Sequence, residues 1–201
     1  NAIKVTEDGV SMKDFNNGEA FVENNLDYDL LERTISIVDA GDGIDKHQEI
    51  VNDLQYRIGG GNWINLDYVN LANGDSPKVL AYNVNFVPGN LEFRLRGDES
   101  KLPSVSIVKS TIQAPSSAPD VTVGFDLVNY TNTINFEGQD KLEYSLSPNG
   151  PWIDLDNLDA DDLVGNVYIR IKASKSSLAS LNKVLTFTPV LNLRIVGFSI
   201  H

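Results

Sequence analysis

The stretch that decides the fold is residues 142–156, "LEYSLSPNGPWIDLD", because its pattern occurs a second time in the chain. Residues 54–67 read "LQYRIGGGNWINLD". Each copy gives an alternating apolar and polar run, a turn rich in Gly or Pro, a tryptophan, and an ending of aliphatic, polar, Leu and Asp. Alternation with a period of two is typical of a half-buried β-strand, and the turn residues favour a hairpin after it. We therefore expect a strand and a tight turn in both copies.

A second pair of segments repeats in the same order. Residues 89–104, "GNLEFRLRGDESKLPS", align without a gap with residues 165–180, "GNVYIRIKASKSSLAS". Two repeated blocks in one order indicate an internal duplication of a structural module. Residues 113–120, "QAPSSAPD", have the composition of a linker. The sequence therefore predicts an N-terminal module over residues 1–112, a linker over 113–120 and a C-terminal module over 121–201.

Strand signals dominate the whole chain. The clearest alternating runs are residues 54–58, 91–95, 142–146 and 167–171, and the last strand of the second module is expected at 183–188. Residues 191–201 would be either an added edge strand or the start of another module. Helix signals amount to single turns at 28–33 and 176–182. We predict an all-β chain of two tandem antiparallel β-sandwich modules, each of the size that seven strands require.

Composition narrows the possible environments and partners. Apolar residues make up 41% of the 201 residues, enough for a core in each module. The formal charge of −12 disfavours nucleic acid and anionic membrane surfaces as partners. The absence of cysteine excludes disulfides and cysteine-ligated zinc, and no apolar run reaches the length of a membrane span. Because the chain starts with Asn1-Ala2 rather than Met, we expect these two residues to be the remnant of a cleaved purification tag.

The repeated unit resembles a fibronectin type III or immunoglobulin-like module. That pattern has an alternating strand with a Tyr, a hairpin turn, a Trp, and later a Gly-led strand containing an Arg. The matching positions are Tyr56, Trp63 and 89–97 in the first copy, and Tyr144, Trp152 and 165–173 in the second. More narrowly, residues 120–189 are similar to repeats of secreted and S-layer-associated proteins of Gram-positive bacteria. They are also similar to a family of unknown function that follows secreted calcineurin-like metallophosphoesterases. Residues 34–112 match loosely, and 3–33 lie outside the resemblance.

The resemblance implies a secreted or cell-surface protein. The expected role is a non-catalytic spacer, adhesion or ligand-presenting segment of a larger exported protein, such as the C-terminal region of a secreted phosphoesterase. The partners would be neighbouring domains of that protein, and the cell wall or a glycan. The alternative role is an accessory carbohydrate-binding module of a secreted hydrolase.

No catalytic residues are predicted. The chain has two histidines, His47 and His201. Residues 41–45, "GDGID", match one short block of metallophosphoesterases, but that class needs several histidine ligands to hold its two metals. An Asp/Gly-rich loop is the simpler interpretation. No Gly-x-Ser-x-Gly nucleophile elbow is present. We therefore do not expect this segment to be an enzyme.

One acidic connection is a candidate calcium site, and calcium is the one cofactor considered. Hard cations need several oxygen ligands from one or two loops. The candidate ligands are Asp154, Asp156, Asp159, Asp161 and Asp162, with a weaker second group at Asp39, Asp42 and Asp45. Neither group has the spacing of an EF-hand. Solvated turns between strands are the simpler interpretation of both groups. Residues 159–162 could instead begin a short helical turn.

Two further features concern surface recognition. Trp63 and Trp152 occupy equivalent repeat positions and are therefore expected in the cores; exposed rings would favour the carbohydrate-binding alternative. The candidates for exposed ligand-binding rings, outside the shared pattern, are Tyr68, Tyr82 and Tyr130. Residues 96–98 spell Arg-Gly-Asp, the tripeptide that animal adhesion proteins present to integrins. Because Arg96 aligns with Lys172 in the repeat, we expect it in the strand and not at a loop tip.

Overall fold

The computed structural model describes residues 11–15, 18–38, 48–66, 78–138 and 140–190, and these form an all-β sandwich architecture. The chain divides into two compact units. The first comprises Asn1–Pro115 with Ala173–Leu178, and the second comprises Ser116–Lys172 with Ala179–His201. The division after Pro115 falls inside the segment 113–120 that the composition marks as a linker. Strands account for 41% of the structure and helices for 11%.

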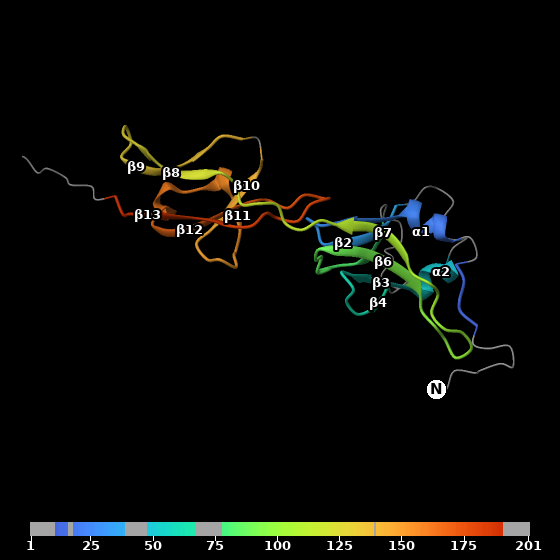
Figure 1. The fold of residues 1–201 in the computed structure, drawn as a ribbon. Coiled ribbons are helices and arrows are strands. Elements are labelled where there is room, and N and C mark those ends of the chain that lie inside the picture. The colour runs from blue at the N-terminus through green and yellow to red at the C-terminus, as the bar shows by residue number, and fades with distance from the viewer. Residues whose placement is uncertain (1–10, 16–17, 39–47, 67–77, 139, 191–201) are drawn as a thin grey trace, which may run out of the picture. The chain divides into compact units, whose positions relative to one another are not determined.

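The first unit contains two antiparallel sheets (Figure 1). One has the order β1-β2-β5, formed by β1 (Leu26–Asp29), β2 (Thr34–Ile37) and β5 (Lys78–Ala81). The other has the order β4-β3-β6-β7, formed by β4 (Ile64–Asn65), β3 (Leu54–Ile58), β6 (Gly89–Leu95) and β7 (Ile107–Ile112). These seven strands match the number expected for a sandwich module.

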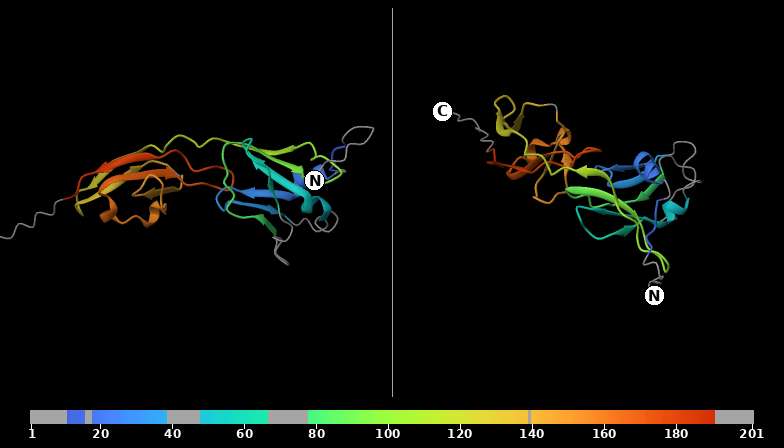
Figure 2. Two further views of the ribbon diagram at one scale, coloured as in Figure 1. Left: turned by 90° about the horizontal axis from the view of Figure 1, so that it is seen from below. Right: turned by 45° about the vertical axis from the view of Figure 1, so that its right-hand side comes forward.

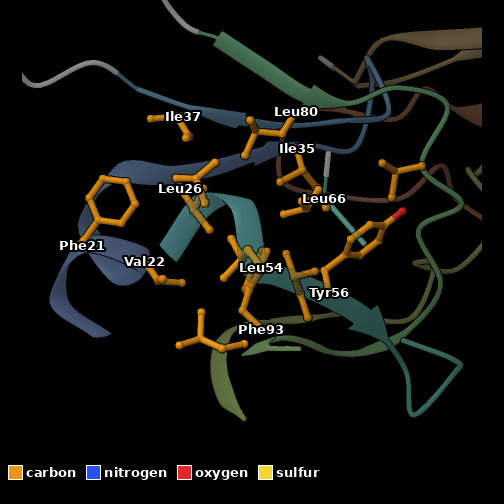
Figure 3. Close-up of a cluster of buried hydrophobic side chains, with 14 of the residues drawn as sticks. Phe21, Val22, Leu26, Ile35, Ile37, Leu54, Tyr56, Leu66, Leu80 and Phe93 are labelled. Atoms are coloured by element: carbon orange, nitrogen blue, oxygen red, sulfur yellow. The ribbon is translucent and has the colours of Figure 1, made fainter. Parts of the chain in front are cut away.

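Two short helices were not predicted from the sequence. α1 (Glu19–Asn25) runs directly into β1, and α2 (Gln48–Asp53) runs directly into β3. Phe21 and Val22 of α1 and Val51 of α2 are buried in the core of the first unit. Figure 3 shows side chains from α1 and from both sheets pointing toward one another, among them Leu54 and Phe93. The helices therefore close the end of the core that the two sheets alone would leave open.

The second unit has a four-stranded and a two-stranded antiparallel sheet. The larger has the order β11-β10-β12-β13, formed by β11 (Ile153–Asp154), β10 (Leu142–Ser145), β12 (Gly165–Ile171) and β13 (Lys183–Phe187). The smaller is the hairpin of β8 (Val121–Asp126) and β9 (Thr131–Phe136). Figures 1 and 2 show this hairpin, in yellow, layered over the orange and red sheet. Val121 of the hairpin and Val167 of the sheet meet in one core.

The described part of the second unit has six strands, one fewer than the seven expected for the whole module. In the first unit the connection from β4 to β6 is long enough to include β5. The corresponding connection from β11 to β12 is shorter and forms two 3₁₀ turns, η3 (Leu155–Asn157) and η4 (Ala160–Asp162). η4 packs against β9, the second strand of the hairpin.

The duplication read from the sequence is confirmed in the strand registers. Tyr56 pairs with Phe93 in the first unit, as Tyr144 pairs with Ile169 in the second. Both four-stranded sheets have the same order of strands. The predicted strands at 54–58, 91–95, 142–146, 167–171 and 183–188 all fall on observed strands, with ends that differ by at most two residues.

The two copies also share side-chain bonds after the Arg-bearing strand. Ser104 Oγ accepts from Leu95 N at 2.9 Å and donates to Val105 O at 2.9 Å. Ser180 Oγ accepts from Ile171 N at 2.8 Å and donates to Leu181 O at 2.9 Å. Both serines are 6% exposed. Each serine therefore fixes the return of the chain onto the strand end in its own unit.

Of the two predicted helical turns, one coincides in part with an observed turn and the other does not. At 28–33, β1 continues to Asp29 and a turn covers 30–33. At 176–182 the prediction is wrong, because this segment is a bent loop held by bonds such as Ser177 N to Ser174 Oγ at 3.1 Å. Residues 191–201 lie outside the described residues.

Candidate functional site

The outer face of the β4-β3-β6-β7 sheet carries a cluster of charged and aromatic side chains. Leu54 and Tyr56 of β3 are buried, so the alternation of the strand puts Gln55 and Arg57 on the opposite face. By the same alternation, β6 turns Leu91 and Phe93 inward and Glu92 and Arg94 outward. Asn65 lies on the outer face because it pairs with Gln55, and Trp63 precedes it by two residues. We call Gln55, Arg57, Trp63, Asn65, Glu92 and Arg94 the outer-face cluster.

Two guanidinium groups cover Trp63 in this cluster. The Cζ atoms of Arg57 and Arg94 lie 4.5 and 4.2 Å from the centroid of the indole ring. Arg57 Nε donates to Glu92 Oε2 at 2.5 Å, and Arg94 Nε donates to Gln55 Oε1 at 2.8 Å. Burial, and then the neighbouring charge of Arg57, lower the pKa of Arg94.

The second unit repeats the arrangement with different charges. Arg170 Cζ lies 3.8 Å from the centroid of Trp152, and its Nε donates to Glu143 Oε1 at 2.6 Å. Glu143 is 7% exposed. Asp154, which pairs with Glu143 in the sheet, forms an ion pair with Lys172 at 2.6 Å. The hydrogen bond that Lys172 Nζ donates to Asp154 Oδ1 raises the pKa of Lys172.

The expectation that both tryptophans lie in the cores is wrong. Trp63 and Trp152 are half-buried and belong to neither core cluster. Each stands just before a two-residue edge strand, in register with the outward-facing side chains of β3 or β10. Guanidinium groups lie over the two rings.

The structure does not bring the five aspartates of the acidic connection together as a metal site. Asp154 pairs with Lys172, whereas Asp162 accepts from Tyr144 OH at 2.9 Å. Burial, and then Asp162, raise the pKa of Tyr144. Within the described ranges, no group of three or more His, Cys, Asp or Glu residues is placed to hold a metal ion. Asp156 lies in η3 and Asp161 in η4.

The short turn predicted at 159–162 is confirmed. It is η4, and the Asp159 side chain caps it by accepting from Asp161 N at 3.0 Å. The weaker acidic group, Asp39, Asp42 and Asp45, lies outside the described residues, as do the 41–45 segment, His47 and His201.

The Arg-Gly-Asp tripeptide is part of a closed turn. The expectation that Arg96 lies in the strand is wrong by one residue, because β6 ends at Leu95. Arg96 Nε donates to Asp53 Oδ1 at 3.0 Å. Asp98 Oδ1 accepts from Ser100 N at 2.7 Å, and Asp98 Oδ2 pairs with Lys13 at 3.1 Å. The bonds from Ser100, first from its backbone and then from its side chain, hold the pKa of Asp98 well below its usual range. Both charged groups therefore have partners within their own unit.

Two of the three predicted tyrosines are exposed, one in each unit. Tyr82 follows β5 in the first unit and Tyr130 lies in the β8–β9 turn of the second, and each is 62% exposed. Tyr68 lies outside the described residues. The sequence did not single out the exposed Leu127 and Val128 beside Tyr130, which are 76% and 84% exposed. It also missed the outer-face cluster, although the repeat contained the signal in the outward parity of Gln55, Arg57 and Arg94.

In comparisons with known proteins, no family model, curated protein or solved structure matches this chain. Among the helices that the structure describes, none is long and apolar enough to cross a membrane.

Proposed function

We propose that this chain is a non-catalytic, extracellular segment of a larger exported bacterial protein, in which it acts as a spacer between functional domains. The observation that supports the proposal most is the duplicated four-stranded sheet. Its two copies share the features that a β-sandwich needs to fold: a buried tyrosine, a buried serine that closes the strand end, and an arginine stacked on a tryptophan. We infer that these three shared features stabilise the fold of each unit.

The mechanism is passive. Each unit has its own buried core, so each can keep its dimensions without support from a ligand. The loops differ between copies in length and composition, whereas the register of β3 with β6 is the same as that of β10 with β12. Selection for a spacer would keep the framework and leave the loops free to diverge.

Replacement in the full-length parent protein tests the spacer function. We expect deletion of residues 11–190 to reduce the activity or surface accessibility of the neighbouring domain. Exchange of the same residues for an unrelated pair of β-sandwich domains of similar length should restore it. An exchange that fails as completely as the deletion would contradict a passive role, because the lost property would then reside in the surface of this segment.

The second candidate function is an accessory carbohydrate-binding module. It is favoured by the position of Trp63 and Trp152 on the outer faces of the sheets, where an aromatic ring can meet a sugar. The test is co-sedimentation of the whole chain with insoluble cellulose, xylan, chitin and bacterial cell wall. Co-sedimentation that Trp63→Ala or Trp152→Ala abolishes would support this function. Recovery of all the protein in the supernatant with each of the four polymers would contradict it.

A further inference from the structure

We propose that the outer-face cluster of the first unit binds a saccharide that carries a single carboxylate, which Arg57 and Arg94 receive together. This inference goes beyond the spacer function and does not depend on it. It would give the second candidate function a ligand class and a location.

The two arginines have donors to spare. The Nε atom of each is already bonded, to Glu92 in one case and to Gln55 in the other. No hydrogen bond from a terminal Nη atom of either arginine occurs among the residues that the structure describes. A guanidinium group presents its remaining N–H groups in a planar fork that matches a carboxylate.

The cluster has an excess of positive charge on an acidic protein. It contains two guanidinium groups and one carboxylate, that of Glu92, whose side chain is 13% exposed. Both guanidinium groups lie over the same indole ring, and the charge of Arg57 disfavours the charged form of Arg94. A bound carboxylate between them would relieve this repulsion.

The neighbouring groups favour a saccharide as the rest of the ligand. Gln55 Nε2 donates to Asn65 Oδ1 at 2.7 Å, so two amides with further donor and acceptor capacity stand beside Trp63. Amides can bond the hydroxyl groups of a sugar. The net charge of −12 repels a polyanion at long range, which favours a ligand with one negative charge.

The second unit provides an internal comparison in which the same framework is closed to anions. Glu143 stands where the first unit has Gln55, and it already occupies the guanidinium of Arg170. Asp154 replaces Asn65, and Ser145 aligns with Arg57. The two units thus share the framework, but among the described residues only the first carries two guanidinium groups over the indole ring with an amide, Gln55, in place of Glu143.

The experiment is a fluorescence titration of the whole chain carrying Trp152→Phe, so that Trp63 alone reports. The probe is sodium glucuronate, with glucose and sodium acetate as its two halves. We expect saturable quenching by glucuronate in the millimolar range, and affinities at least about tenfold weaker for glucose and for acetate. Raising the salt from about 20 to about 200 mM should weaken glucuronate binding several-fold. Equal binding of glucose or acetate, or no response to glucuronate, would overturn the proposal.

A single substitution gives Arg94 the carboxylate partner that Arg170 has in the second unit. Gln55→Glu should pair with Arg94 as Glu143 pairs with Arg170, which keeps the fold and reduces glucuronate affinity by at least about tenfold. The matched control is Glu143→Gln, which should leave the Trp63 titration unchanged. The Nε–H NMR resonance of Arg94 gives a second readout: glucuronate should shift it in the parent chain and not in Gln55→Glu. Undiminished binding by Gln55→Glu would show that the guanidinium pair is not the site.

Discussion

Replacement of Ser104 by alanine should destabilise the first unit, because its hydroxyl group closes the end of β6. The Oγ atom accepts from Leu95 N and donates to Val105 O, both at 2.9 Å. Leu95 is 5% exposed, so its N–H group has no access to water once the serine oxygen is gone. Val105 is 72% exposed, so its carbonyl can bond to water instead.

The cost of the substitution is therefore that of one buried, unsatisfied backbone donor, about 1–3 kcal/mol. The equivalent change, Ser180→Ala, should cost less, because its donor, Ile171 N, belongs to a half-buried residue. For a unit of this size, about 2 kcal/mol corresponds to a fall in melting temperature of roughly 10 °C.

Urea unfolding monitored by tryptophan fluorescence can measure the two effects separately. A Trp152→Phe background reports the first unit through Trp63, and a Trp63→Phe background reports the second through Trp152. Ser117→Ala, at an exposed site, is the control and should stay within about 0.5 kcal/mol of the parent. If Ser104→Ala costs no more than this control, the hydroxyl does not stabilise the strand end and the argument from the shared serine fails.

Three further predictions concern pH, backbone conformation and calcium. The folded-state pKa of Asp98 lies below its unfolded value of about 4, so its carboxylate stabilises the first unit above that pH and the contribution is lost on acidification; Asp98→Asn should therefore flatten the fall in melting temperature below about pH 4. Gly89→Ala should cost more than about 2 kcal/mol in urea unfolding, because φ is +127° and a Cβ would lie 2.6 Å from Gly59 Cα. Gly165→Ala, with φ +70° and nothing within 4 Å, should cost about 1 kcal/mol. Melting of the chain should be the same with added calcium and with chelator, because three of the five carboxylates of the acidic connection, those of Asp154, Asp159 and Asp162, already bond within the protein. A calcium-dependent rise would show that they can converge on an ion.

The sequence predicted those strands that show a clear apolar/polar alternation or that occur in both copies of the repeat. β3 begins and ends where the alternation at 54–58 does, and the gapless repeat fixed the position of β12. The helices escaped prediction for a physical reason. α2 is only six residues long and passes without a break into β3, so its helical period is too short to read beside a strand period.

The candidate site was not predicted because the residue type and the strand register of Trp63 give opposite predictions. A tryptophan in an immunoglobulin-like pattern suggests a core residue, whereas the register of the strand puts the side chain on the outer face. Yet Asn65, two residues after Trp63, faces Gln55 across the sheet, and the buried neighbour of Gln55 is Tyr56. Once the pairing is known, the parity puts Trp63 outside. Pairing depends on turn geometry, which the Gly-rich turn at 59–61 leaves open in the sequence.

The contacts of Lys13 have a practical consequence for anyone who wishes to trim this protein. Lys13 pairs with Asp53 at 2.5 Å and with Asp98 at 3.1 Å, and its backbone N–H donates to Leu102 O at 2.9 Å. A shortened gene that began at residue 34 would encode a product in which Asp53 and Asp98 lack the ammonium group of Lys13 that pairs with both. It would also lose α1 from the core. Cloning boundaries for the first unit should therefore be drawn upstream of Ser11, well outside the repeat that first reveals the fold.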